Sequence, residues 1–235
     1  MFLQAGFNPR TLQGLGLTYT LYPALRALYP EALAQKAAMQ RHLRPFNTHP
    51  YAAAAIVGGI IFHEERVARG EYAPERVDRF KDSLMGPLAA LGDGFFWLSL
   101  RPAVGALSVA LVPFIGGWAA VVFAVLYNVV HLSTRAHLFS LGLREGDALV
   151  DHLQRLHAPL WSKRLRNAAA FFTGATAAWL CLDFGRGYGG DQWAGLTFAS
   201  LSLGALAWFL KGKSSSPAVL LYTSALLAGL LGFFF

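Results

Sequence analysis

The sequence predicts an all-α integral membrane protein with amphipathic cytoplasmic N-terminal helices, re-entrant or broken helical segments, and then about four transmembrane helices. First, 55% of its 235 residues are hydrophobic and only 14% are charged, whereas soluble domains average about 25% charged residues. Second, all 13 acidic residues except Asp93 lie in three polar blocks, 1–82, 135–166 and 183–191. Third, the mean hydropathy is positive, at +0.41. This composition excludes a disordered chain, and the single cysteine, Cys181, excludes a disulfide-bonded scaffold.

The clearest apolar stretch does not have the length of a single membrane span. Residues 102–134 contain no Asp, Glu, Lys or Arg. As one helix they would run about 50 Å, which is too long for one span and too short for two. We therefore expect a short entry arm at 102–112 and a full span at 114–134. The residues at which the helix could break are Pro113, Gly116 and Gly117.

Three further stretches are each close to the roughly 20 residues that cross a hydrocarbon core; they are 167–182, 193–210 and 217–235. Loop charges orient these spans by the positive-inside rule. The block 135–166 has more basic than acidic residues, which places it in the cytoplasm, whereas 183–192 suits the outside. The net charge of +7 is thus explained by membrane topology better than by nucleic-acid binding, and no signal peptide is expected.

The N-terminal 50 residues are predicted to form cytoplasmic or interfacial helices. Pro30 and Glu31 are typical of a helix start. The helix that follows, 31–44, carries three basic side chains, Lys36, Arg41 and Arg44. These side chains suit an interfacial helix lying against anionic headgroups, and they suit equally well a solvated helix packed on the rest of the protein.

Two short apolar segments between residues 46 and 101 are interrupted by glycine and proline. Residues 51–62 contain Gly58-Gly59, and residues 84–100 contain Gly86-Pro87 and then Gly92-Asp93-Gly94. Segments this short are typical of buried or re-entrant helices. Paired interrupted segments also indicate the substrate site of a transporter.

Two polar residues in this region are candidates for ligand contacts. Asp93 is a carboxylate in an apolar stretch, and such a group usually faces a cavity or a partner. It suits an acceptor for sugar hydroxyls, or else a helix cap or a residue of a tight turn between glycines. Asn47 suits either an amide offered to a polar ligand or a cap for the helix that begins near Pro50.

The histidines do not indicate a metal site. The spacing of His49, His63, His131 and His137 matches no metal signature, and we expect polar core histidines. The sequence also contains no phosphate-binding loop and no nucleophile motif. We therefore predict no metal, no cofactor and no catalytic residue on this chain.

Three motifs together resemble the IID component of the mannose/fructose/sorbose-type phosphotransferase system (PTS). They are Leu-Tyr-Pro-Ala-Leu-Arg-Ala-Leu-Tyr-Pro at 21–30, Arg-His-Leu at 41–43 with Phe-Asn-Thr-His-Pro at 46–50, and Leu-Met-Gly-Pro-Leu-Ala-Ala-Leu-Gly-Asp at 84–93 with Phe96-Trp97 and Arg101-Pro102. The resemblance implies four substrate-binding residues, Asn47, Asp93, Trp97 and Arg101. Two departures are Gly94, where proline is common, and His49, where glutamine is common.

The resemblance also implies a function. A IID subunit pairs with a IIC membrane subunit in the bacterial inner membrane, as a multi-pass hetero-oligomer. The pair forms a channel or elevator that translocates a hexose for phosphorylation by the IIB phosphocarrier, which a IIA protein recharges. The phosphoryl-donor histidine lies on IIB, so this subunit is expected to be non-catalytic. The basic block 135–166 suits the docking of IIB, although topology alone explains its charge.

The expected organisation has four parts: 1–50, N-terminal helices; 51–134, a transport-core region with broken helices and the first long span; 135–166, a cytoplasmic basic segment; and 167–235, C-terminal transmembrane helices. The alternative function is a non-transporting regulatory or scaffold membrane subunit of a reduced PTS, because the chain is shorter than typical members. A self-sufficient secondary transporter is less favoured, since Asp93 is the only acid in the apolar part.

Overall fold

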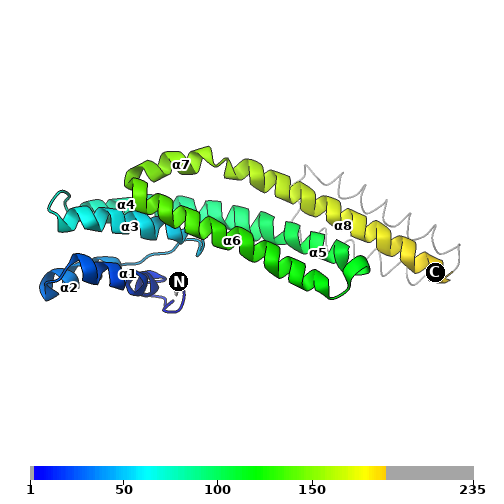
Figure 1. Cartoon of the computed structure of the whole chain (residues 1–235), viewed down its shortest axis with the longest axis horizontal. Coiled ribbons are helices and arrows are strands. Elements are labelled where there is room, and N and C mark those ends of the chain that lie inside the picture. Colours follow the sequence, from blue (N-terminus) through cyan, green and yellow to red (C-terminus); the bar gives the residue numbers. More distant parts are fainter. Residues whose placement is uncertain (1–2, 189–235) are drawn as a thin grey trace. The chain divides into compact units, whose positions relative to one another are not determined.

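The computed structural model describes residues 3–188. This part of the chain consists of helices and turns and contains no β-strand (Figure 1). The chain divides into two compact units, 1–172 and 173–235, which we treat separately. The elements are α1 (Gly14–Leu28), α2 (Ala32–His42), α3 (Ala53–Ala68), α4 (Glu75–Gly92), the π-helix η1 (Asp93–Leu100), α5 (Arg101–Ile115), α6 (Trp118–Glu145), the 3-10 turn η2 (Gly146–Ala148), α7 (Leu149–Arg155) and α8 (Ala158–Tyr188). The predicted all-α class is confirmed over the described residues.

The helices α4, η1 and α5 follow one another without interruption, so Glu75–Ile115 is one continuous helical run. The predicted breaks at Gly86-Pro87 and Gly92-Asp93-Gly94 are therefore wrong. Asp93 itself has helical dihedral angles, φ −62° and ψ −45°. The chain widens into a π-helix there instead of turning, and the buried Ser99 hydroxyl donates to the carbonyl oxygen of Gly94 at 2.7 Å.

Glycines in α3 and α6 permit close packing of these two helices and do not interrupt α3, which corrects the expected break at Gly58-Gly59. A Cβ atom at Gly58 would overlap the carbonyl oxygen of Phe139, and one at Gly142 would overlap that of Ala55. Both residues thus lie where the two backbones approach each other. The main hydrophobic core surrounds this contact, with α1, α3, α4 and α6 contributing most of its buried side chains.

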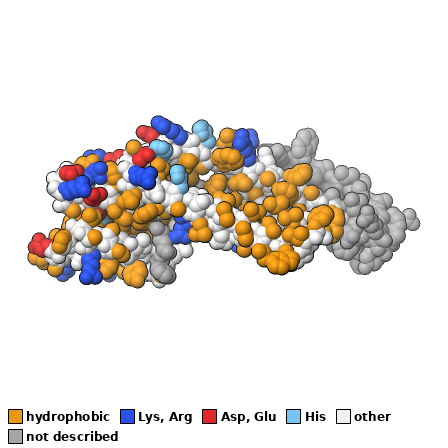
Figure 2. Space-filling view, in the orientation of Figure 1, with side chains coloured by type: hydrophobic (Ala, Val, Ile, Leu, Met, Phe, Trp, Pro, Cys, Tyr) orange, Lys and Arg blue, Asp and Glu red, His pale blue; other side chains and the backbone are white. Residues whose placement is uncertain are grey.

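Two helices in the described part are long and apolar enough to cross a membrane, Glu75–Ile115 and Trp118–Arg155. The predicted break in 102–134 is confirmed at Gly116, which has a positive φ of 55°. Residues 102–112 do not form the expected separate entry arm but are the end of the continuous helix Glu75–Ile115. Figure 2 shows hydrophobic side chains covering α5 and the adjacent half of α6, while charged side chains gather over α2, α3, α4 and α7.

The other predicted spans are only partly within the described residues. Residues 167–182 form the middle of α8, which is not one of the two candidate spans. Residues 193–210 and 217–235 lie outside the described part of the chain.

Helix α2 is packed against the rest of the protein. It begins at Ala32, with Glu31 as its N-cap. Of its basic residues, Arg41 pairs with Glu64 of α3 at 3.0 Å, and Arg44 just beyond the helix pairs with Asp78 of α4 at 2.9 Å. Of the two interpretations of this segment, the structure favours the packed helix, because two of its three cations point to neighbouring helices.

Candidate functional site

The structure brings three of the four predicted site residues onto one face of the continuous helix. Asp93, Trp97 and Arg101 are spaced four residues apart, so they lie on successive turns. All three side chains are exposed. The guanidinium carbon of Arg101 lies 5.8 Å from the centroid of the Trp97 ring. The face therefore presents a carboxylate, an indole ring and a cation in a row.

Asn47 lies in the segment before α3 and not on the helix that carries these three residues. Its backbone N–H points to the sulfur of Met85 at 3.3 Å, and Met85 precedes Asp93 by about 12 Å along the helix axis. Neither does Asn47 cap a helix, because the N-cap of α3 is Ala52 and makes no side-chain cap. The two structural alternatives proposed for these residues, a cap for Asn47 and a tight turn for Asp93, are both wrong.

Aromatic rings from the segment before α3 pack against the same helix. The imidazole of His49 stacks on Phe96, with ring centroids 5.1 Å apart and planes 6° apart, and its edge meets Trp97 at 5.3 Å. Gly92 makes this possible, because a Cβ atom there would overlap the imidazole. Tyr51 lies 5.9 Å from Trp97. Trp97 is therefore held from behind by two rings while 37% of it stays exposed.

His49 is neutral. Burial, only partly opposed by Asp93, lowers its pKa to about 4. Its Nδ1 accepts a hydrogen bond from the Tyr51 backbone N–H at 3.3 Å, so the proton is assigned to Nε2. Nε2 has no partner in the described part of the chain. The expected core location is confirmed for His49, His63 and His131, whereas His137 is exposed.

Helix α6 closes the other side of the cluster. The ring of Tyr51 stacks on His131 with centroids 4.5 Å apart, and the guanidinium of Arg135 lies 5.9 Å from the Tyr51 ring centroid. Tyr51 thus connects the exposed face of η1 to α6. Among residues 3–188, no group of three or more His, Cys, Asp or Glu side chains could hold a metal ion.

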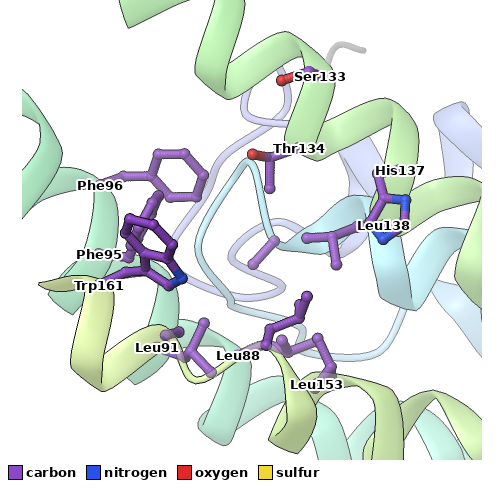
Figure 3. Close-up of a pocket in the computed structure, with 13 residues that line it drawn as sticks. Leu88, Leu91, Phe95, Phe96, Ser133, Thr134, His137, Leu138, Leu153 and Trp161 are labelled. Carbon is purple, nitrogen blue, oxygen red and sulfur yellow. The ribbon is translucent and has the colours of Figure 1, made fainter.

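A cavity of about 420 Å³ lies on the opposite side of η1 (Figure 3). The polar side chains that line the cavity come from α6, and Trp161 of α8 closes the cavity beside Phe95 and Phe96. This cavity could not be predicted from the sequence. Its lining comes from five elements, and the apolar residues in each of them match ordinary core or span positions.

A buried carboxylate, Glu64, holds three helices together. It is fully buried and accepts hydrogen bonds from both Nε and Nη2 of Arg41 at 3.0 Å, from His42 Nε2 at 2.7 Å and from the Tyr29 hydroxyl at 2.7 Å. Its neighbour Glu65 has 40% of its side chain exposed and pairs with Arg69 one turn along.

These contacts predict a loss of stability in acid. Burial alone would raise the pKa of Glu64, but hydrogen bonds from His42, Arg41 and Tyr29 outweigh it and lower the pKa to about 2, from an ordinary value of 4.5. Since the folded-state pKa is lowered, this stabilisation is present above about pH 5 and is lost as the pH falls toward 2. We expect the thermal midpoint in detergent to fall between pH 6 and pH 3. In Glu64→Gln the fall should be smaller, and an equal fall would exclude Glu64 as its cause.

The architecture and the site define a helical protein that has two helices long and apolar enough to cross a membrane and an exposed polar and aromatic face. The family model for the PTS mannose/fructose/sorbose family IID component matches residues 1–176. The chain belongs to this family, whose members are membrane proteins. It is 38% identical over 149 residues to the mannose-specific EIID component of Escherichia coli K12, an alignment that covers 63% of this chain and 53% of that protein. It is 35% identical over 155 residues to the fructose permease IID component of Bacillus subtilis, covering 65% and 56%.

Solved structures agree with this membership. The mannose transporter ManYZ in complex with microcin E492 matches with a TM-score of 0.59 at 33% identity, over 74% of this chain and 65% of that one. A chain described as a membrane protein matches with a TM-score of 0.70 at 28% identity, over 98% and 91%. In sequence, the chain spans about half the length of the curated relatives it matches.

Proposed function

We propose that this chain is the membrane IID subunit of a mannose-family PTS permease. It forms with a IIC subunit the channel or elevator that translocates a hexose for phosphorylation by IIB, and IIA recharges IIB with phosphoryl groups. The observation that carries this proposal is the exposed row of Asp93, Trp97 and Arg101, in a chain that belongs to the IID family. The similarity to one chain of the ManYZ transporter complex supports a IIC partner and a sugar substrate.

The three side chains of this row have complementary chemistry for a sugar. A carboxylate such as Asp93 accepts hydrogen bonds from hydroxyl groups, and the guanidinium of Arg101 donates them. The face of an indole ring such as Trp97 offers a flat apolar surface to the C–H groups of a pyranose. Because His49 and Tyr51 pack behind Trp97, its ring is held in place before a sugar arrives. This arrangement fixes orientation at low entropic cost.

In this proposal the chain binds and moves the sugar but does not transfer the phosphoryl group. The phosphoryl-donor histidine lies on IIB, and the complex lies in the inner membrane as a multi-pass assembly. The backbone N–H of Asn47 points to Met85, which lies about two turns of helix before Asp93. The contribution of Asn47 to sugar binding therefore requires the IIC subunit or a longer substrate contact. We therefore rank Asn47 below the other three residues.

Replacing Asp93 with asparagine tests the sugar-binding role. We expect the assembled complex to retain both membrane subunits while its rate of sugar phosphorylation at low sugar falls about 10-fold or more, because a hydrogen bond to a charged acceptor contributes about 1.5–3 kcal/mol. Asp82→Asn is the matched control, since Asp82 is exposed on α4 outside the row. Unchanged phosphorylation in Asp93→Asn, with normal assembly, would remove Asp93 from the substrate path.

A further inference from the structure

The cavity behind η1 has the properties of a lipid site. We propose that it binds one acyl chain of an anionic phospholipid, whose phosphate group pairs with Arg155, Lys163 and Arg164. This inference depends on membership of a membrane-protein family but not on sugar transport, so the two proposals can fail separately.

The interior of the cavity suits an alkyl chain. Its volume of about 420 Å³ is in the range of small-molecule sites. Only three of its lining side chains are polar, Ser133, Thr134 and His137. The hydroxyls of Ser133 and Thr134 already donate to the carbonyl oxygen of Val130, at 3.0 and 2.8 Å. A ligand inside therefore meets mainly hydrocarbon and aromatic surface, as Figure 3 shows.

The cavity lies at the right depth in the chain for a lipid. The uncharged run 102–134 ends at Thr134, which lines the cavity, and Arg135 follows directly. Tryptophan is enriched at the boundary between hydrocarbon and headgroups, and Trp161 closes the cavity with the guanidinium of Arg164 5.0 Å from its ring centroid. An acyl chain can thus lie in the cavity while its headgroup stays among the basic side chains.

Among the residues that the structure describes, the nearby cations form no ion pair that would compete with a phosphate. Of the three acids in the block 135–166, Glu145 pairs with His152, and Asp147 pairs with Arg76 and approaches His63. The third, Asp151, lies on α7 one turn before Arg155 and is exposed to solvent. Within residues 3–180, no carboxylate lies within ion-pair distance of the three proposed phosphate-binding residues, Arg155, Lys163 and Arg164, all of which are exposed. Clusters of basic residues beside a membrane helix attract anionic lipids. This surplus of positive charge selects a phospholipid with a negative headgroup.

Photo-crosslinking tests the proposal in membranes that hold the full chain and any partner. Membrane vesicles from expressing cells are fused with vesicles of phosphatidylglycerol that carries a diazirine in one acyl chain, or of phosphatidylcholine with the same chain. Labelled peptides are then mapped by mass spectrometry. We expect phosphatidylglycerol to label residues 133–138 and 153–161 in clear excess over phosphatidylcholine.

Two pairs of variants test recognition of the headgroup and occupation of the cavity independently. Neutralising the three cations to glutamine should lower the phosphatidylglycerol excess about 10-fold or more, since each basic residue contributes measurably to anionic-lipid binding, whereas Arg144→Gln should leave it unchanged. Ser133→Trp should block labelling of 153–161 by filling the cavity, whereas Ser140→Trp, on α6 outside the lining, should not.

Two results would overturn the proposal. Equal labelling of these peptides by both lipids would show that no anionic headgroup is recognised. Labelling of residues 102–130 without labelling of 133–138 and 153–161 would show that protein, and not lipid, covers the cavity.

Discussion

Replacing Glu64 with alanine is expected to lower the free energy of unfolding by about 3–5 kcal/mol, because removal of one partner from a buried ion pair leaves the other charge uncompensated. The carboxylate is fully buried, and Arg41, with only 13% of its side chain exposed, would lose its acceptor. Tyr29 and His42 would lose theirs as well. Denaturant titration in detergent micelles, followed by helix content, measures the change.

The neighbouring glutamate provides the control. Glu65→Ala removes an exposed pair with Arg69, which is expected to change the free energy of unfolding by less than about 1 kcal/mol. If the two alanine variants lose the same stability, the buried network contributes no more than a surface pair, and our account of how α1 and α2 are attached to α3 is wrong.

The second large effect is expected at the contact between α3 and α6. In Gly142→Val, the new Cβ atom would overlap the carbonyl oxygen of Ala55 and crowd the backbone nitrogen of Gly59. Both are backbone atoms, so the helices must separate. Overpacking of this kind costs about 1–3 kcal/mol and sometimes more, and we expect valine here to lie at or above that range. The thermal midpoint of the purified protein and its yield in the membrane fraction measure the loss.

A glycine on an open surface gives the matched comparison. A Cβ atom at Gly86 meets nothing within 4 Å, and Gly86 lies inside α4. Gly86→Ala is therefore expected to be neutral or to stabilise by about 0.5–1 kcal/mol through helix propensity. If Gly142→Val were tolerated as well as Gly86→Ala, the close approach of α3 and α6 would be contradicted.

The apolar and charged patterns were enough to predict the helical membrane class and the break at Gly116. The hydrophobic and charged residues of a stretch indicate whether it lies in the membrane or in water. A glycine pair after a long apolar run indicates that the helix ends there. The same rule failed at Gly58-Gly59 and at Gly92-Asp93-Gly94. Glycine also serves helices that must approach another backbone or ring, and the sequence alone does not show which neighbour is present.

The candidate site was predictable only in part. The four-residue spacing of Asp93, Trp97 and Arg101 can be seen in the sequence, but it places them on one face only if the helix continues through the glycines. The role of Glu64 depends on partners 22 to 35 residues away, which no local pattern indicates. The cavity behind η1 likewise depends on α7 and α8 returning to α4 and α6.

The most direct test of the proposed function is sugar uptake by vesicles that contain this chain, its IIC partner and phosphorylated IIB. Labelled mannose, fructose, sorbose and N-acetylhexosamines would be supplied outside, and sugar phosphate would be measured inside. We predict that one of these sugars accumulates as its phosphate, and only when both membrane chains are present. An assembled complex that accumulates none of them would contradict transport and favour a regulatory membrane subunit.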